Sequence, residues 1–223
     1  MSKAFIPIFL SNALLSALSI SNLGMISSMV GFIHSQKHDV DTYQVNWPRN
    51  TVYLKALPEH IWMDQGHTSN GVAGYGFFLG LFGMVVAWRL RRRDGKISSK
   101  SLTLLAVLQT LATLFTLSAL IFTFTVTRQT SHQHILPQLA VSNIPYSMHK
   151  WTPETWFKAV LELPLAEGER WEKIRRNVRV MEAWRWMLIP IFLLDLVALG
   201  CSAWAVSWWR RERREQSEFT IEK

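Results

Sequence analysis

Four long apolar runs constrain this chain more than any other feature of its sequence. They cover about residues 4–33, 71–88, 102–126 and 186–209, and a helix needs ~20 apolar residues to cross a bilayer. The third run holds no charged residue, and Asp195 is the one ionisable residue of the fourth. A soluble bundle would instead show a polar face on each helix. The sequence therefore predicts a single all-α membrane domain over residues 1–223, built as a four-helix transmembrane bundle.

Composition excludes several classes of protein. Charged residues make up 18% of the chain, against roughly 25% in an average soluble domain. The single cysteine, Cys201, excludes an intramolecular disulfide framework and a multi-cysteine metal site. The sequence carries no phosphate-binding loop, nucleophile elbow or dinucleotide motif after a strand. We therefore expect no cofactor. Whether the protein is an enzyme stays open, and a non-enzymatic function is favoured.

Basic residues predict the orientation in the membrane. Six of them fall between the second and third runs: Arg89, Arg91, Arg92, Arg93, Lys96 and Lys100. Because short basic loops stay in the cytoplasm, the loop 89–101, the tail 210–223 and both termini are expected there. The outer loops are then 34–70 and 127–185. A basic stretch from Lys173 to Arg185 lies in the second of them and argues against this orientation. The argument is weak, since long loops follow the rule for basic residues poorly. The host is expected to be an endomembrane or the plasma membrane.

The net charge of +8 does not point to nucleic acid. Much of the excess lies in the loop 89–101, with a smaller part in the tail 210–223. Basic residues at these places set the orientation of the helices in the membrane and contact anionic lipid headgroups. The expected partners are therefore the bilayer and, at most, another membrane protein or further copies of this chain.

Small and polar residues recur at helical spacing inside the apolar runs. Gly76, Gly80 and Gly83 lie on one face of the second run, and Thr113 and Thr116 share a face of the third. Helices in lipid associate through close packing at small residues and through hydrogen bonds. These residues, together with Asp195, are the predicted packing residues of the bundle.

Asp195 is the residue with the highest energetic cost in this set. A carboxyl group at mid-membrane costs ~2.5–3.5 kcal/mol on insertion scales. One interpretation is structural, with Asp195 bonded to Thr116 or Thr113 and so joining the fourth helix to the third. The other makes Asp195 a ligand-binding, proton-coupled or catalytic group, and it is the best catalytic candidate in the sequence.

All seven histidines fall in the two outer loops, and the densest group is HSQKHDVD. His34 and His38 are one helical turn apart and are followed by Asp39 and Asp41. Imidazole and carboxylate are ligands for a transition metal, so these four residues form a candidate metal site, with His132 and His134 as further ligands. The alternative is that the histidines are solvated or locally bonded.

The second outer loop is predicted to be partly helical. TPET suits a helix start, with Thr152 as N-cap and Pro153 at the first helical position, and WFKAVLEL continues to Pro164. A second helix is expected after Gly168, with Trp171, Ile174, Val178 and Met181 along one side. We expect these elements to form an extracytoplasmic cap, and the alternative is a helix lying in the membrane interface.

One stretch carries a family resemblance. WTPETWFKAVLELPL, a charged helix and MEAWRWMLIPIFLL, over Trp151 to Leu194, resemble uncharacterised four-span integral membrane proteins of filamentous fungi. The resemblance implies an accessory role in a secondary-metabolite pathway and transfers no site residues. Two functions follow: a non-enzymatic accessory or scaffold factor, or a small membrane-embedded oxygenase, cyclase or isomerase acting on a lipophilic metabolite.

Overall fold

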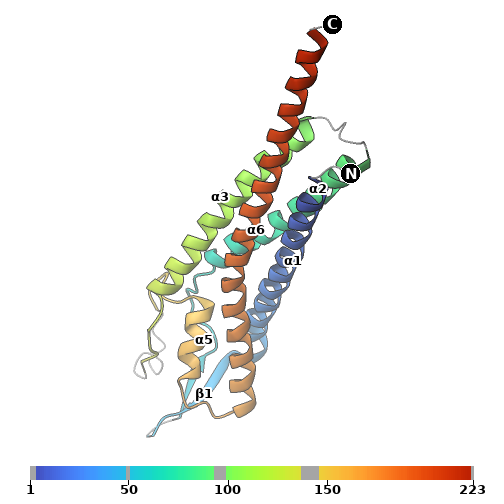
Figure 1. The fold of residues 1–223 in the computed structure, drawn as a ribbon. Coiled ribbons are helices and arrows are strands. Elements are labelled where there is room, and N and C mark those ends of the chain that lie inside the picture. Colours follow the sequence, from blue (N-terminus) through green and yellow to red (C-terminus); the bar gives the residue numbers. More distant parts are fainter. Residues whose placement is uncertain (1–3, 49–50, 93–98, 137–145, 222–223) are drawn as a thin grey trace. The chain divides into compact units, whose positions relative to one another are not determined.

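Four long helices dominate a computed structural model that describes residues 4–48, 51–92, 99–136 and 146–221. They are α1 (Phe5–Ser35), α2 (Asp64–Arg92), α3 (Ser99–Gln129) and α6 (Gly168–Ile221) (Figure 1). All four are long and apolar enough to cross a membrane. Even α2, with 29 residues, extends roughly 44 Å at 1.5 Å per residue. The structure is therefore mostly α-helical, a four-helix bundle that fits a multi-pass membrane protein.

The chain divides into two compact units, and each long helix contributes to both. The bundle unit contains Met1–Ser21, Gly71–Ser118 and Leu188–Lys223. The loop unit contains Asn22–Asn70 and Ala119–Met187. The predicted spans thus correspond mostly to the bundle unit, and the predicted outer loops lie in the loop unit.

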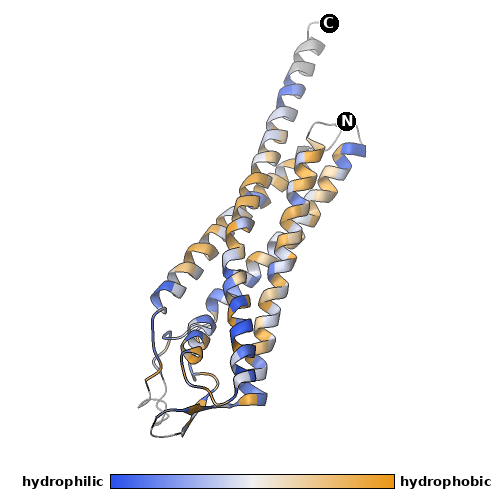
Figure 2. Cartoon of the chain, turned by 60° about the horizontal axis from the view of Figure 1, so that its bottom comes forward, coloured by the Kyte–Doolittle hydropathy of each residue, from blue (hydrophilic) through white to orange (hydrophobic). Residues whose placement is uncertain are grey.

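The bundle unit has a buried apolar core, but it also buries polar side chains and exposes large apolar ones. Asn12, Gln109 and Asp195 are at most 1% exposed, whereas Leu10, Phe78 and Leu114 are more than half exposed. Orange, apolar residues recur along the long helices in Figure 2. Large exposed apolar side chains together with buried polar ones are what hydrocarbon solvent favours.

Glycines allow α2 to lie directly against α1. A Cβ atom built on Gly80 would lie 2.6 Å from the backbone oxygen of Asn12, and one on Gly76 would lie 2.5 Å from Oγ of Ser19. A Cβ on Gly83 would overlap the Asn12 side chain. The three predicted glycines therefore face α1 where a side chain would have no room, as small residues permit in membrane helices.

A β-hairpin, which we did not expect from the sequence, lies in the loop unit. Strands β1 (Thr42–Asn46) and β2 (Thr51–Lys55) pair antiparallel, with Tyr43 opposite Leu54. Tyr43, Val45 and Leu54 are buried, which is the alternation expected of a strand with one covered face. The free edge of β1 is bonded by the second loop, because Asn46 N donates to Pro164 O and Ala166 N donates to Gln44 O, each at 2.9 Å.

Helix α5 (Pro153–Leu161) begins where the sequence predicts. Thr152 is its N-cap, and the Thr152 and Thr155 side chains each bond the other's backbone N–H. The indole N–H of Trp156 donates to the Ala56 carbonyl at 2.8 Å, and Phe157 packs on Phe32 with ring centroids 4.9 Å apart. Helix α5 therefore packs through its aromatic side chains on both the end of α1 and the segment after β2.

The long helices extend beyond the predicted spans. Helix α2 begins at Asp64 and not near Gly71, and α6 runs without interruption from Gly168 through the fourth span. The side of α6 that carries Ile174, Val178 and Met181 is buried, as a packed cap requires. Of the six basic residues that predict the orientation, Arg93 and Lys96 lie outside the described residues.

We predict opposite effects from two glycine substitutions in α2. Gly80→Ala should lower the thermal stability of the purified protein by about 1–3 kcal/mol, because the added methyl group would press on the α1 backbone. Gly74→Ala is the control, since a Cβ there meets nothing within 4 Å, and it should be neutral or stabilising because alanine favours helix. Equal melting curves for the two variants in detergent would contradict the close α1–α2 contact.

Candidate functional site

Asp195 of α6 lies against α3 in the bundle unit. Its Oδ2 atom accepts a 2.6 Å hydrogen bond from the Thr116 hydroxyl, and both residues are buried. The other hydroxyl considered from the sequence, that of Thr113, donates instead to the Gln109 carbonyl of its own helix at 2.8 Å. Thr116 is therefore the residue that bonds α3 to α6.

The second oxygen of Asp195 is buried and has no hydrogen-bond partner among the described residues. Oγ of Ser202, two turns further along α6, is in the same condition. A buried polar atom without a partner is costly and calls for an explanation. This pair is the observation that keeps a chemical role for Asp195 open.

A second polar contact joins α1 to α3. The amide of Gln109 donates to Oδ1 of Asn12 at 3.1 Å, and Nδ2 of Asn12 donates to the Ile8 carbonyl at 2.8 Å. Ser16 of α1 also donates to the Phe77 carbonyl of α2 at 3.3 Å. Hydrogen bonds thus connect α1 with α2 and α3, in addition to the contact of α3 with α6.

Of the four candidate metal residues, His34 lies at the end of α1, His38 and Asp39 lie in the π-helix η1 (Gln36–Val40), and Asp41 follows directly after it. The rings of His34 and His38 are 4.3 Å apart, and both side chains are exposed, as are those of Asp39 and Asp41. Within the described part of the chain, no three or more His, Cys, Asp or Glu side chains are arranged to hold a metal ion. The structure brings the two imidazoles together without a third ligand, and metal binding stays a prediction.

The histidines of the second loop are placed elsewhere. Nδ1 of His134 lies 2.7 Å from a carboxylate oxygen of Glu162. His132 occupies the turn after α3 with φ of 60°. Neither residue joins His34 and His38 in a ligand group within the described residues.

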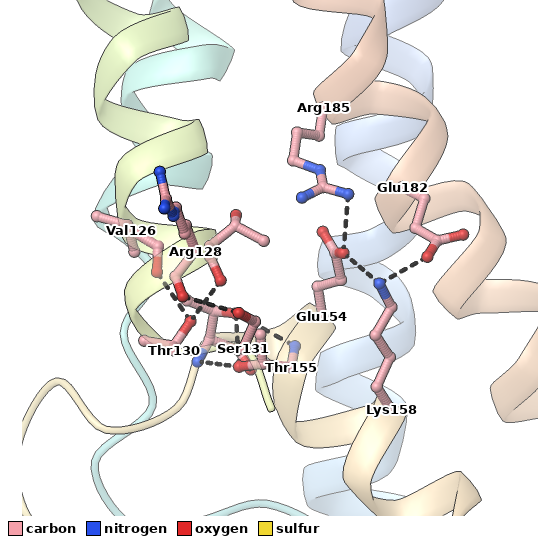
Figure 3. A network of polar contacts seen from close by, with 11 residues as sticks. Val126, Arg128, Thr130, Ser131, Glu154, Thr155, Lys158, Glu182 and Arg185 are labelled. Atoms are coloured by element: carbon pink, nitrogen blue, oxygen red, sulfur yellow. Dashed lines mark hydrogen bonds and ion pairs between the residues drawn. The ribbon is translucent and has the colours of Figure 1, made fainter. Parts of the chain in front are cut away.

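A charged network that we did not expect from the sequence lies in the loop unit, centred on Glu154 of α5 (Figure 3). Oε1 of Glu154 lies 2.7 Å from Nζ of Lys158 and 3.2 Å from a guanidinium nitrogen of Arg185 on α6. Lys158 also contacts Glu182 of α6 at 2.6 Å. Two acids and two bases therefore connect α5 to α6, and the Glu154 side chain is only 6% exposed.

The charges of this network support one another. Burial by itself lowers the pKa of Lys158, but hydrogen bonds to Glu154 and Glu182 outweigh it, and the pKa is raised. Because the pKa of Lys158 is higher in the folded protein than in the unfolded chain, Lys158 stabilises the fold fully at any pH below the ordinary lysine pKa. This stabilisation is lost only when the pH rises through the raised pKa of the folded state. The contribution of Lys158 to stability is therefore complete throughout the physiological range.

One sequence signal for this network was available. Glu154 and Lys158 are four residues apart in α5, the spacing at which a helix pairs opposite charges, and Glu182 and Arg185 are three apart in α6. The sequence analysis placed Glu154 only at the start of a helix. Its pairing with Arg185 joins residues far apart in the chain, which spacing within one helix does not show.

Comparison with known proteins adds no relative: no protein family, curated protein or solved structure matches the chain.

We predict that Glu154→Gln destabilises the protein far more than removal of an exposed acid. Loss of the buried carboxylate would leave Arg185 without its partner, at a cost of ~3 kcal/mol for a broken buried pair. Glu172→Gln is the matched control, because Glu172 and its partner Arg175 are largely exposed and 3.6 Å apart, and such pairs contribute about 0–1 kcal/mol. Thermal unfolding of the purified variants measures both effects. Similar melting temperatures would show that Glu154 is not a structural centre.

Proposed function

We propose that this chain is a non-enzymatic multi-pass membrane protein that acts as an accessory or scaffold factor. The observation that carries the proposal is that buried polar groups of the bundle unit form hydrogen bonds between helices. Gln109 donates to Asn12 and Thr116 donates to Asp195. Asp195 is only 1% exposed. Groups used in this way hold helices together and are closed to a substrate from outside.

The setting of this role follows from the resemblance to four-span fungal membrane proteins. That resemblance supports service to a secondary-metabolite pathway in an endomembrane or the plasma membrane. Lipophilic intermediates of such a pathway partition into the bilayer, where a small membrane protein can hold or organise a partner membrane protein. A second copy of this chain is the other partner we consider.

The second candidate function is a membrane-embedded oxygenase, cyclase or isomerase acting on a lipophilic metabolite. The unpartnered buried atoms, Oδ1 of Asp195 and Oγ of Ser202, favour it. In that case Asp195 would be the group that contacts the substrate. Intramembrane carboxyl groups are functional by default, so this alternative is tested directly.

Deletion of the gene in its source organism, followed by metabolite profiling, tests the two functions. The accessory role predicts partial loss of several related products, and accumulation of a single precursor would instead indicate an enzyme. Complementation with Asp195→Asn should restore the profile, because an amide still accepts a bond from Thr116. Asp195→Leu should reduce the amount of protein in the membrane. A folded Asp195→Asn protein, present at the normal level but inactive, would refute the structural interpretation of Asp195.

The orientation is tested separately by thiol labelling. In a Cys201→Ala background, single cysteines are introduced as Lys100→Cys and Glu59→Cys, both at exposed positions. With both termini cytoplasmic, an impermeant maleimide should label the Lys100→Cys variant only from the cytoplasmic side of sealed vesicles. The Glu59→Cys variant should be labelled only from the other side. The reverse pattern would overturn the assignment.

A further inference from the structure

The loop unit contains a partly open cavity of about 310 Å³, at the lower end of the roughly 300–1,000 Å³ typical of small-molecule sites. Its lining comes from α1, the first turns of α2, the end of α3, the start of α5 and α6. None of the residues used above for Asp195 or for the histidine group of α1 lies on it. The cavity therefore requires a separate explanation.

Most of the lining is apolar and deformable. Met29, Met63 and Met181 contribute thioether side chains, and Ile26, Ile33 and Trp184 add further apolar surface. Methionine is flexible and polarizable, so it adapts to ligands of varied shape. This part of the cavity suits the apolar body of a lipophilic molecule.

The polar part of the lining includes the carboxylate of Glu154. Both Lys158 and Arg185 contact Oε1 of this carboxylate, and Figure 3 shows its other oxygen with no dashed line. Among the described residues no hydrogen bond or ion pair reaches Oε2, and the Glu154 residue, which lines the cavity, is 5% exposed. A carboxylate oxygen at the cavity surface that has no protein donor can accept a hydrogen bond from a bound molecule.

Two other lining residues have buried polar atoms without a partner among the described residues. They are Oε1 of Gln65, an acceptor, and Nε1 of Trp184, a donor. A hydroxyl group both donates and accepts hydrogen bonds. It therefore matches a polar wall with unused atoms of both kinds better than a group that only donates or only accepts.

The charges exclude an ionised ligand. Glu154 and Glu182 are already balanced by Lys158 and Arg185. An added ammonium or carboxylate group would be an uncompensated charge in a buried place, which is strongly destabilising. A neutral donor can bond Oε2 of Glu154 and leave this balance unchanged.

We propose that the cavity binds a neutral lipophilic alcohol, whose hydroxyl group donates to Oε2 of Glu154 and whose apolar body lies among the methionines. The proposal stands whether the protein is an accessory factor or an enzyme. It assigns the loop unit a binding role that the polar contacts of the bundle unit do not require.

The test uses the full-length purified protein and a decanol that carries a photoreactive diazirine. Mass spectrometry should locate the adducts on lining residues such as Met29 and Met181. Excess 1-decanol should abolish the labelling, whereas decane and decylamine should leave most of it. Equal competition by decane, or labelling confined to other surfaces, would overturn the proposal.

A matched pair of variants tests the location. Gly66 lines the cavity, and a Cβ built on it meets only Cε of Met29, at an ordinary 3.7 Å, so Gly66→Leu should fold, fill the cavity and lose the labelling. Gly74→Leu is the control on the same helix, where a Cβ meets nothing within 4 Å, and it should be labelled like the wild type. A folded Gly66→Leu protein that is still labelled would refute the site. If Gly66→Leu does not fold, the competition by decane and decylamine on the wild type decides alone.

Discussion

Hydrocarbon offers no hydrogen bonds, and this constraint governs the bundle unit. A polar side chain placed there must find its partner on another helix or on its own backbone. Thr116 and Asp195 do so between α3 and α6, and Gln109 and Asn12 do so between α3 and α1. These contacts require the helix backbones to lie close together. Between α1 and α2, a different pair, Gly80 provides the room for a close approach.

The loop unit is organised by different physics. Its centre is a cluster of aromatic side chains, with Trp151, Trp156 and Phe157 almost fully buried, and its charges are paired around Glu154. Such a core resembles that of a water-soluble protein, where apolar burial drives folding. In the bundle unit Oδ1 of Asp195 is buried without a protein partner among the described residues, and in the loop unit Oε1 of Gln65 and Nε1 of Trp184, both on the cavity, are in the same condition. The functional questions concentrate on these buried polar atoms.

The sequence predicted the parts that depend on local information. The long helices follow from uninterrupted apolar runs, and the start of α5 follows from the Thr152 cap. Thr116 could be named as a partner of Asp195 because depth along two spans can be counted from the helical rise. The metal hypothesis for His34 and His38 rests on equally local spacing. The fold, however, adds no third ligand to them among the described residues.

The sequence by itself determined that the four long helices suit a lipid environment, since length and apolar character decide whether a segment can cross a bilayer. Only the tertiary structure decided how the segments of the loop unit fold. The hairpin of β1 and β2 is short, and two strands alone are marginal, so it depends on bonds from Pro164 and Ala166 far along the chain. The pairing of Glu154 with Arg185 was hidden for the same reason, because it joins two helices whose contact no local pattern specifies.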